Sequence, residues 1–299
     1  KEGESMHKYL RTVGFSLYQK KHDIQKLLQD LTEQTEYSQI WKLQLDSETN
    51  LCRVRAEMAP DMGIDIYGEM DEFGTIKADY YVPYLLSHDM SSEADCSIQR
   101  HTEKETFAGL LDEYRVGISL IYYLENLMEY QERVLEKKTT ETSCVNLAGL
   151  CVSGKILLPI KKNSNQMEIA KVASKERNSL LEAAKNGDED AMEMLTLEDI
   201  DLYSQISRRV TKEDIYSIID TSFMPAGIEC DQYSVIGDIL SINIKKNKIT
   251  GEEVFDMKLE CNDMIFHVAI NSQDLVGEPE VGRRFKGQIW MIGTAKFKT

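Results

Sequence analysis

Proline, tryptophan and histidine are scarce in this sequence, whose 299 residues contain 5 Pro, 2 Trp and 5 His. So few prolines exclude a Pro-rich linker. The histidines show neither the H-E-x-x-H spacing nor flanking cysteines at zinc-finger distances, which excludes the common zinc motifs. The longest apolar runs, residues 118–124 and 156–160, are far shorter than the roughly 20 residues that span a bilayer. We therefore expect no membrane anchor.

An excess of positive charge is also missing. The chain has 51 Asp and Glu against 35 Lys and Arg, a formal net charge of −16. Such a field repels phosphate backbones and anionic lipid, which argues against general binding to nucleic acid or membranes. Hydrophobic residues make up 42% of the chain, too many for a disordered protein. The length allows one large domain or two ordinary ones.

The cysteines form no C-x-x-C pair and are scattered along segments with a strand-like pattern. A chain of this length has core enough to fold without disulfides, so we expect reduced, buried thiols in a cytoplasmic protein. The six are Cys52, Cys96, Cys144, Cys151, Cys230 and Cys261.

The first part of the chain changes its hydrophobic period. Ile24, Leu27, Leu28 and Leu31 follow helical spacing and predict a short amphipathic helix that begins at Asp23. Alternating patterns and intervening turn residues then predict four short strands in a meander. These strands cover residues 41–45, 51–58, 63–70 and 75–84.

Further along, Thr102 and Glu105 form a capping box in front of a broad apolar stripe, which predicts one long helix over residues 102–136. Residues 144–150 and 155–160 predict a hairpin that turns at Ser153–Gly154. The stretch 165–224 is helical in pattern, with Gly187 as a stop. Within it, the helix starts are predicted at Asp188, Thr196 and Thr211.

From residue 233 the pattern is purely β, with four or five twisted strands in about 65 residues, typical of an OB-type barrel. The helix that usually precedes the fourth strand of such a barrel is reduced to a loop. We thus predict an α+β protein: an antiparallel sheet with a long covering helix and a helical segment, followed by a small OB-like β-barrel. The predicted domains are 6–228, with Met6 as a natural start, and 229–299.

Residues 149–155 satisfy G-x-x-x-x-G-K, the phosphate-binding loop pattern. A working loop needs Ser or Thr next and then a helix whose amides meet the phosphates. Here Ile156 follows and the pattern is that of a strand. We expect no nucleotide site and no cofactor.

Two groups of residues contain the side-chain types found in metal sites or in catalytic sites. His88, Cys96 and His101, with Glu103 and Glu105, share one polar segment, but their spacing enforces no ligand geometry, so we expect no metal. A Cys230–His267 pair is conceivable as nucleophile and base, although a buried thiol at a domain junction is the more ordinary interpretation. No G-x-S-x-G is present, and we assign no catalytic residue.

The last segment differs in charge from the rest. Residues 235–299 contain nine basic and nine acidic side chains, so the net negative charge lies before them. Four side chains on one strand face are candidates for binding a partner or ligand: Arg284, Lys286, Gln288 and Trp290. In this interpretation Trp290 lies outside the core. The charge asymmetry favours a second interpretation, in which Trp290 packs against the acidic helical part of the chain. Arg284 and Lys286 then pair with carboxylates of that helical part.

Several blocks of sequence resemble an uncharacterised family of proteins from clostridial Gram-positive bacteria, a domain of unknown function. They are residues 6–15, 112–118, 207–209, 212–214, 229–233 and 282–287. The resemblance covers nearly the whole chain from Met6. It implies a cytosolic bacterial protein and leaves the activity open.

The leading hypothesis is a non-catalytic binding or regulatory protein whose C-terminal barrel contacts a protein partner or small ligand. One alternative is a hydrolase of unrecognised type that acts through carboxylates. Another is weak binding of single-stranded nucleic acid by the barrel.

Overall fold

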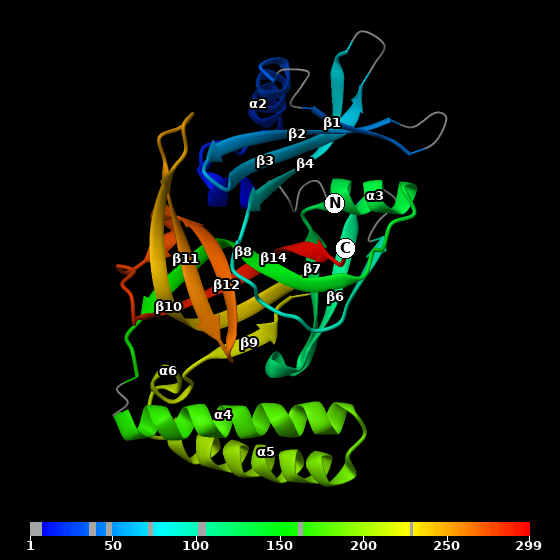
Figure 1. Ribbon diagram of the computed structural model, residues 1–299. Helices are drawn as coiled ribbons and strands as arrows, with labels where there is room; N and C mark the ends of the chain where they lie inside the picture. Colours follow the sequence, from blue (N-terminus) through cyan, green and yellow to red (C-terminus); the bar gives the residue numbers. More distant parts are fainter. Residues whose placement is uncertain are drawn as a thin grey trace.

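Two β-sheets and a helical hairpin make up the protein (Figure 1). The computed structural model describes residues 8–35, 40–45, 50–70, 74–100, 106–160, 164–227 and 230–299, with side chains from residue 172 in the first helix of the hairpin. Mixed helices and sheets confirm the predicted α+β class.

The first sheet is the predicted meander. Its strands β1 (Ile40–Gln44), β2 (Asn50–Ala59), β3 (Met62–Met70) and β4 (Ile76–Leu85) are antiparallel neighbours in chain order. Helix α2 (Lys21–Glu33) lies on the outer side of this sheet and buries the four predicted apolar residues (Figure 1). Burial along β2 and β3 is nearly continuous because the opposite face of the sheet is covered too.

The second sheet has ten strands. The paired order is β13–β8–β12–β11–β10–β14–β7–β6–β5, with β9 also beside β10 and β8 also beside β14. Most pairs are antiparallel, whereas β8–β12, β8–β13 and β14–β7 are parallel. The strand bounds are β5 Cys96–Arg100, β6 Phe107–Glu113, β7 Ile118–Leu124, β8 Thr142–Leu157, β9 Ser222–Pro225, β10 Gln232–Lys246, β11 Glu253–Cys261, β12 Met264–Asn271, β13 Leu275–Val276 and β14 Arg284–Phe297.

The prediction of one long helix over residues 102–136 is wrong. Most of that stretch forms the antiparallel pair β6 and β7 with a 3-10 turn between them, and of its described residues only α3 (Leu127–Leu135) is α-helical. The predicted capping residues Thr102 and Glu105 lie outside the described residues. Two glycines favour strands over a helix in this stretch. Gly117 has a φ of +70° in the turn, and a Cβ on Gly109 would meet the Tyr122 ring at 2.1 Å. Pairing with β14, distant in sequence, then outweighs the local helical pattern.

The predicted hairpin at Ser153–Gly154 is also wrong, because β8 is one continuous strand. Gly154 pairs with Gly287 of β14. A Cβ on Gly154 would meet the Phe285 ring at 2.6 Å. The glycine thus permits a close approach and makes no turn.

The helical segment forms an antiparallel hairpin of α4 (Ser164–Lys185) and α5 (Glu189–Val210), followed by the single turn α6 (Ile215–Ile218). Gly187 has a φ of +90° between the two long helices, and the Asp188 carboxylate accepts a hydrogen bond from the Ala191 amide, as predicted. The start predicted at Thr196 is wrong, since Thr196 lies inside α5 and donates to the Met192 carbonyl. The α5 helix instead ends at Val210, just before the predicted start Thr211, and Asp214 caps α6.

The C-terminal strands β10, β11 and β12 form a meander. Asn262 and Asp263 have φ values of 51° and 60°, which confirms the predicted tight turn between β11 and β12. However, β8 precedes the boundary predicted at residues 228/229 and still pairs with both β12 and β14. Backbone hydrogen bonds therefore cross that boundary.

Candidate functional site

Trp290 lies in the core, so the interpretation that places it outside the core is wrong, and the favoured interpretation is right that it packs within the protein. It is 5% exposed, and its ring lies 5.0 Å from Tyr9 and 5.5 Å from Tyr123 between centroids. The indole Nε1 donates to the Asp231 carboxylate at 2.6 Å. The indole packs against Tyr9 at the N-terminus and Tyr123 of β7, and these contacts lie outside the helical segment.

Arg284 is buried as well, and it holds the helical segment to the strands. Its guanidinium donates to the carbonyls of Leu158 at 2.9 Å, Tyr216 at 2.6 Å and Ile219 at 2.7 Å. These acceptors are backbone carbonyls, whereas carboxylates were predicted. Such carbonyls at a helix end need donors, and Arg284 satisfies several of them at once.

Lys286 and Gln288 complete the predicted group. Lys286 Nζ donates to the Tyr216 hydroxyl and lies 4.3 Å from the centre of its ring, and this hydrogen bond lowers the pKa of Tyr216. Gln288 is exposed and donates to Gln232 at 3.0 Å. Whether the four residues bind a partner stays a prediction, but each of them makes a hydrogen bond within the chain.

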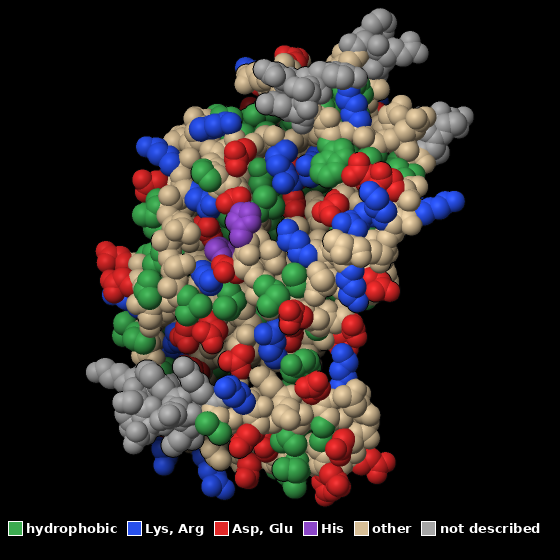
Figure 2. Space-filling view, viewed as in Figure 1, with side chains coloured by type: hydrophobic (Ala, Val, Ile, Leu, Met, Phe, Trp, Pro, Cys, Tyr) green, Lys and Arg blue, Asp and Glu red, His purple; other side chains and the backbone are tan. Residues whose placement is uncertain are grey.

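A different cluster of charged side chains lies on the side of β11 and β12 that faces away from Met257 and Val268. His267 Nδ1 is 2.7 Å from Asp256 Oδ1, and His267 Nε2 is 2.8 Å from Asp89 Oδ2. Asp89 comes from the segment that connects the two sheets. Lys258, the cross-strand neighbour of His267, donates to Asp89 at 2.7 Å. Figure 2 shows histidine side chains among acidic and basic ones on this face.

The electrostatics of the cluster favour its charged forms. Burial lowers the pKa of His267, but hydrogen bonds to Asp256 and Asp89 raise it by more, so the pKa lies above its ordinary value. Hydrogen bonds from Lys258 and His267 lower the pKa of Asp89. Lys245 Nζ lies 3.4 Å from Asp256 and adds a second lysine. With both ring nitrogens facing carboxylates, the imidazolium can donate to each of them.

This arrangement is unsuited to a nucleophile–base pair. A general base needs a free ring nitrogen within hydrogen-bond reach of its nucleophile. Asp89 and Asp256 hold both nitrogens of His267, and Cys230 is exposed. The conceivable Cys230–His267 hydrogen bond is therefore not made.

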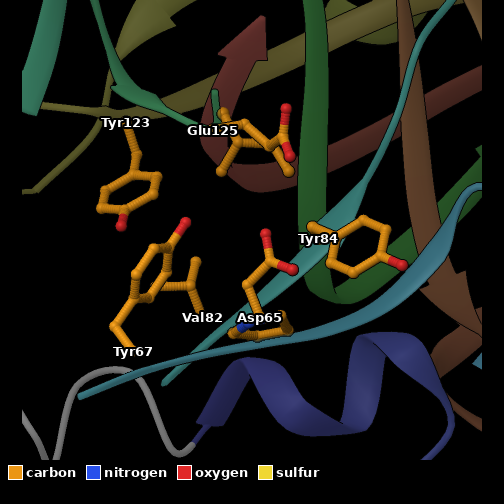
Figure 3. Close-up of a pocket in the computed structure, with 8 residues that line it drawn as sticks. Asp65, Tyr67, Val82, Tyr84, Tyr123 and Glu125 are labelled. Carbon is orange, nitrogen blue, oxygen red and sulfur yellow. The ribbon is translucent and has the colours of Figure 1, made fainter. Parts of the chain in front are cut away.

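Buried carboxylates occur at a second place, where β3 of the first sheet faces β7 and the segment that follows it. Asp65 and Glu125 point toward one space (Figure 3). Arg55 binds both of them. The tyrosines Tyr67, Tyr84 and Tyr123 also line this space, which does not admit a water molecule. Burial raises the pKa of each of these tyrosines, and the Tyr123 hydroxyl has no hydrogen-bond partner among the described residues. The sequence held no signal for this group, because an acidic chain offers too many carboxylates to choose from.

Two residues of the polar segment that was compared with a metal site, His88 and Cys96, have different partners. His88 bonds to Asp61 at 2.9 Å, while Cys96 contacts the Tyr122 hydroxyl at 3.1 Å. The other residues of that segment, His101, Glu103 and Glu105, lie outside the described residues. Among the cysteines, Cys52, Cys151 and Cys261 are buried thiols, whereas Cys96 and Cys144 are half-buried.

The helices and strands place the protein in the α+β class, with two sheets and a helical hairpin. The chain belongs to the family DUF3881, described as a domain of unknown function, E. rectale gene description, whose model matches residues 10–293. This confirms the predicted membership of an uncharacterised family over nearly the whole chain. No curated protein and no solved structure matches the chain. None of the described helices combines the length and the apolar character that a bilayer span needs.

Proposed function

We propose that the protein is a non-catalytic cytoplasmic binding protein, and that a barrel formed around β10–β12 and β14 binds a carboxylate group of a ligand or partner. The observation that carries the proposal is the position of Asp89. A carboxylate from a connecting segment lies between Lys258 and His267 on a strand face and is still 37% exposed.

The strand pairing supports an OB-like barrel. Pairings run from β10 to β11, β12, β8 and β14 and return to β10, which closes a ring of strands. Consecutive antiparallel strands β10, β11 and β12 correspond to the first three strands of an OB fold, and a short 3-10 turn at Ser272–Asp274 stands in place of its helix. The remaining strand, β8, comes from the part of the chain before the helical hairpin.

The position of the charged cluster in this barrel supports binding. OB folds bind ligands on the face of their second and third strands, which here are β11 and β12. Lys258 and His267 lie on these two strands and supply the positive charge, with Lys245 beside them on β10. Asp89 occupies the place that a ligand carboxylate would take. Such charge-assisted hydrogen bonds are about twice as strong as neutral ones.

The two alternative functions have less support. A hydrolase acting through carboxylates needs one that is free to reach substrate, whereas Arg55 binds both Asp65 and Glu125 at the buried site. Single-strand binding would use an exposed aromatic side chain to stack a base, and Trp290 is buried. The barrel face thus favours an anionic ligand held by point charges.

The test compares the wild type with Asp89→Asn, which removes the competing carboxylate and retains the shape of the side chain. The imidazole resonances of His267 are followed by NMR while succinate, a glutamate-rich peptide or a thymidine oligonucleotide is added. We expect succinate or the peptide to bind Asp89→Asn at least about tenfold more tightly than the wild type. The double variant with Lys258→Met should not bind.

The probes separate the sources of the carboxylate. Saturation by succinate identifies a small ligand, and saturation by the peptide alone identifies a protein partner. A response to the oligonucleotide alone would favour the nucleic-acid alternative. The proposal is wrong if no probe shifts the His267 resonances of Asp89→Asn in a saturable manner.

A further inference from the structure

Helix α5 presents large apolar side chains to solvent. The α4 helix lies between α5 and the strands, so one side of α5 faces away from the body (Figure 1). Leu197, Ile200 and Tyr203 are 60%, 58% and 75% exposed. Others on the same helix are Met192, Met194, Leu202 and Val210. Figure 2 shows hydrophobic and acidic side chains together at this end of the molecule. Apolar side chains gathered in this way are typical of an interaction surface.

The spacing on the outward side is that of a helix–helix seam. Steps of four and three residues, the repeat that lines one side of a paired helix, connect Glu193, Leu197, Ile200, Ser204 and Ser207. Of these, Leu197 and Ile200 are apolar and lie next to each other in the repeat. At 100° per residue these positions lie opposite Ala191, the residue of α5 that is fully buried. The seam therefore lies on the side that α4 leaves uncovered.

The charges along α5 differ between its two ends. Its acidic side chains begin at Glu189 and continue as far as Asp201, whereas Arg208 and Arg209 end the helix. A second α5 that runs antiparallel, with the two-fold axis between Ile200 and the next residue, would bring Glu193 of each copy opposite Arg208 of the other. Neither side chain has an ion-pair partner among the described residues. One segment is thus complementary to itself, as a two-fold interface requires.

We propose that the protein forms a two-fold symmetric homodimer in which the α5 helices pack antiparallel around Leu197 and Ile200. The two α4–α5 hairpins then form a four-helix arrangement. Leu197 and Ile200 provide affinity, and the pairs of Glu193 with Arg208 set the direction. This interface is separate from the barrel face, so either proposal stands without the other.

The first test is sedimentation equilibrium of the full chain. We expect the wild type to be a dimer at micromolar concentration, and Leu197→Glu to weaken the dimer at least about tenfold, since it places a charge in the seam of each copy. Circular dichroism checks that the variant remains helical; because Leu197 is 60% exposed, we expect no loss of helix. A wild type that stays monomeric at about 100 μM, or a dimer that Leu197→Glu leaves unchanged, overturns the proposal.

The second test uses charge reversal and rescue. Because of the two-fold symmetry, Glu193→Arg or Arg208→Glu puts like charges opposite each other at two places in the dimer. Each variant should weaken the dimer about tenfold. The double variant restores opposite charges and should recover most of the affinity. Asp30→Arg and Lys26→Glu, exposed on α2, make the same changes in net charge and should have no effect.

The double variant distinguishes a second copy from a different partner. Rescue requires that both residues meet across the same two-fold interface. If the single reversals weaken the dimer but the double variant does not recover, the antiparallel arrangement is wrong. If neither reversal changes the dimer, α5 is not the interface.

Discussion

Asp89 and His267 lie 178 positions apart in the sequence and meet at 2.8 Å between Asp89 Oδ2 and His267 Nε2. Through this contact, the segment that leaves the first sheet is held on the face of β12 in the second. Lys258 binds the other oxygen of the same carboxylate, so one Asp links the connecting segment to two strands. The contact is ionic, and its strength therefore depends on pH.

The first prediction concerns the pH dependence of stability. The carboxylates of Asp256 and Asp89 raise the pKa of His267 above the value of about 6.5 in the unfolded chain. Because the pKa is higher in the folded protein than in the unfolded chain, protonated His267 stabilises the folded state. This contribution is complete at pH values below the pKa of the unfolded chain, and it is lost as the pH rises through the pKa of the folded protein. We expect His267→Gln to lower the free energy of unfolding by about 2 kcal/mol near pH 6, with the difference shrinking at alkaline pH. Urea unfolding over a pH series measures it.

His88 provides the control for this experiment. It also contacts one carboxylate, that of Asp61, but its side chain is 75% exposed. Exposed ion pairs contribute little, so His88→Gln should change stability by less than about 0.5 kcal/mol at any pH. An equal pH dependence in the two variants would contradict the role given to His267.

The second prediction concerns the buried carboxylates. Arg55 neutralises Asp65 and Glu125, which are nearly inaccessible to solvent. Removing the arginine leaves Glu125 without its ion pair and leaves Asp65 with only Arg53, at 4.0 Å. Breaking a buried pair in this way costs about 3–5 kcal/mol. Arg55→Met should therefore unfold at a much lower urea concentration. Adding Asp65→Asn and Glu125→Gln should recover much of the loss, and an unchanged triple variant would contradict the electrostatic explanation.

The third prediction tests the continuity of β8. Gly154→Ala adds a Cβ that meets the Phe285 ring at 2.6 Å and Ile270 at 3.0 Å, and overpacking of this kind costs about 1–3 kcal/mol. The neighbouring Ser153 is exposed, so Ser153→Ala should be neutral within about 0.5 kcal/mol. Thermal unfolding of both variants measures the difference. A hairpin turn at Ser153–Gly154 would instead leave Gly154→Ala without this clash.

The regions that the sequence predicts well are those whose patterns are local. The meander β1–β4 has short connections and clear alternation, and α2 has an apolar stripe at helical spacing. Each can be predicted from neighbours within about ten residues. Gly187 and Asp188 likewise mark the α4–α5 connection through their own backbone chemistry.

The failures involve partners distant in the sequence. Residues 107–124 satisfy a helical stripe and a strand pattern at once, and only pairing with β5 and β14 selects the strands. Gly154 resembles a turn glycine until Phe285 is placed against it. For the same reason, the Asp89–His267 contact and the packing of Trp290 against Tyr9 could not be predicted, since each needs two segments far apart in the chain.

The last prediction concerns the attachment of the helical segment. Arg284 on β14 donates to the carbonyls of Leu158, Tyr216 and Ile219 and thereby joins α6 and the end of β8 to the strands. Arg284→Met keeps the apolar stem but removes all of these donors, leaving carbonyls without partners. We expect amide hydrogen exchange in α6 to accelerate at least about tenfold, because the turn then opens locally. In Arg284→Met, exchange in β1–β4 should stay unchanged. The control variant is Gln288→Ala, since Gln288 lies on the same strand and is exposed; it should leave exchange in α6 unchanged. If Arg284→Met alters exchange equally throughout the chain, Arg284 stabilises the whole fold and does not specifically anchor α6.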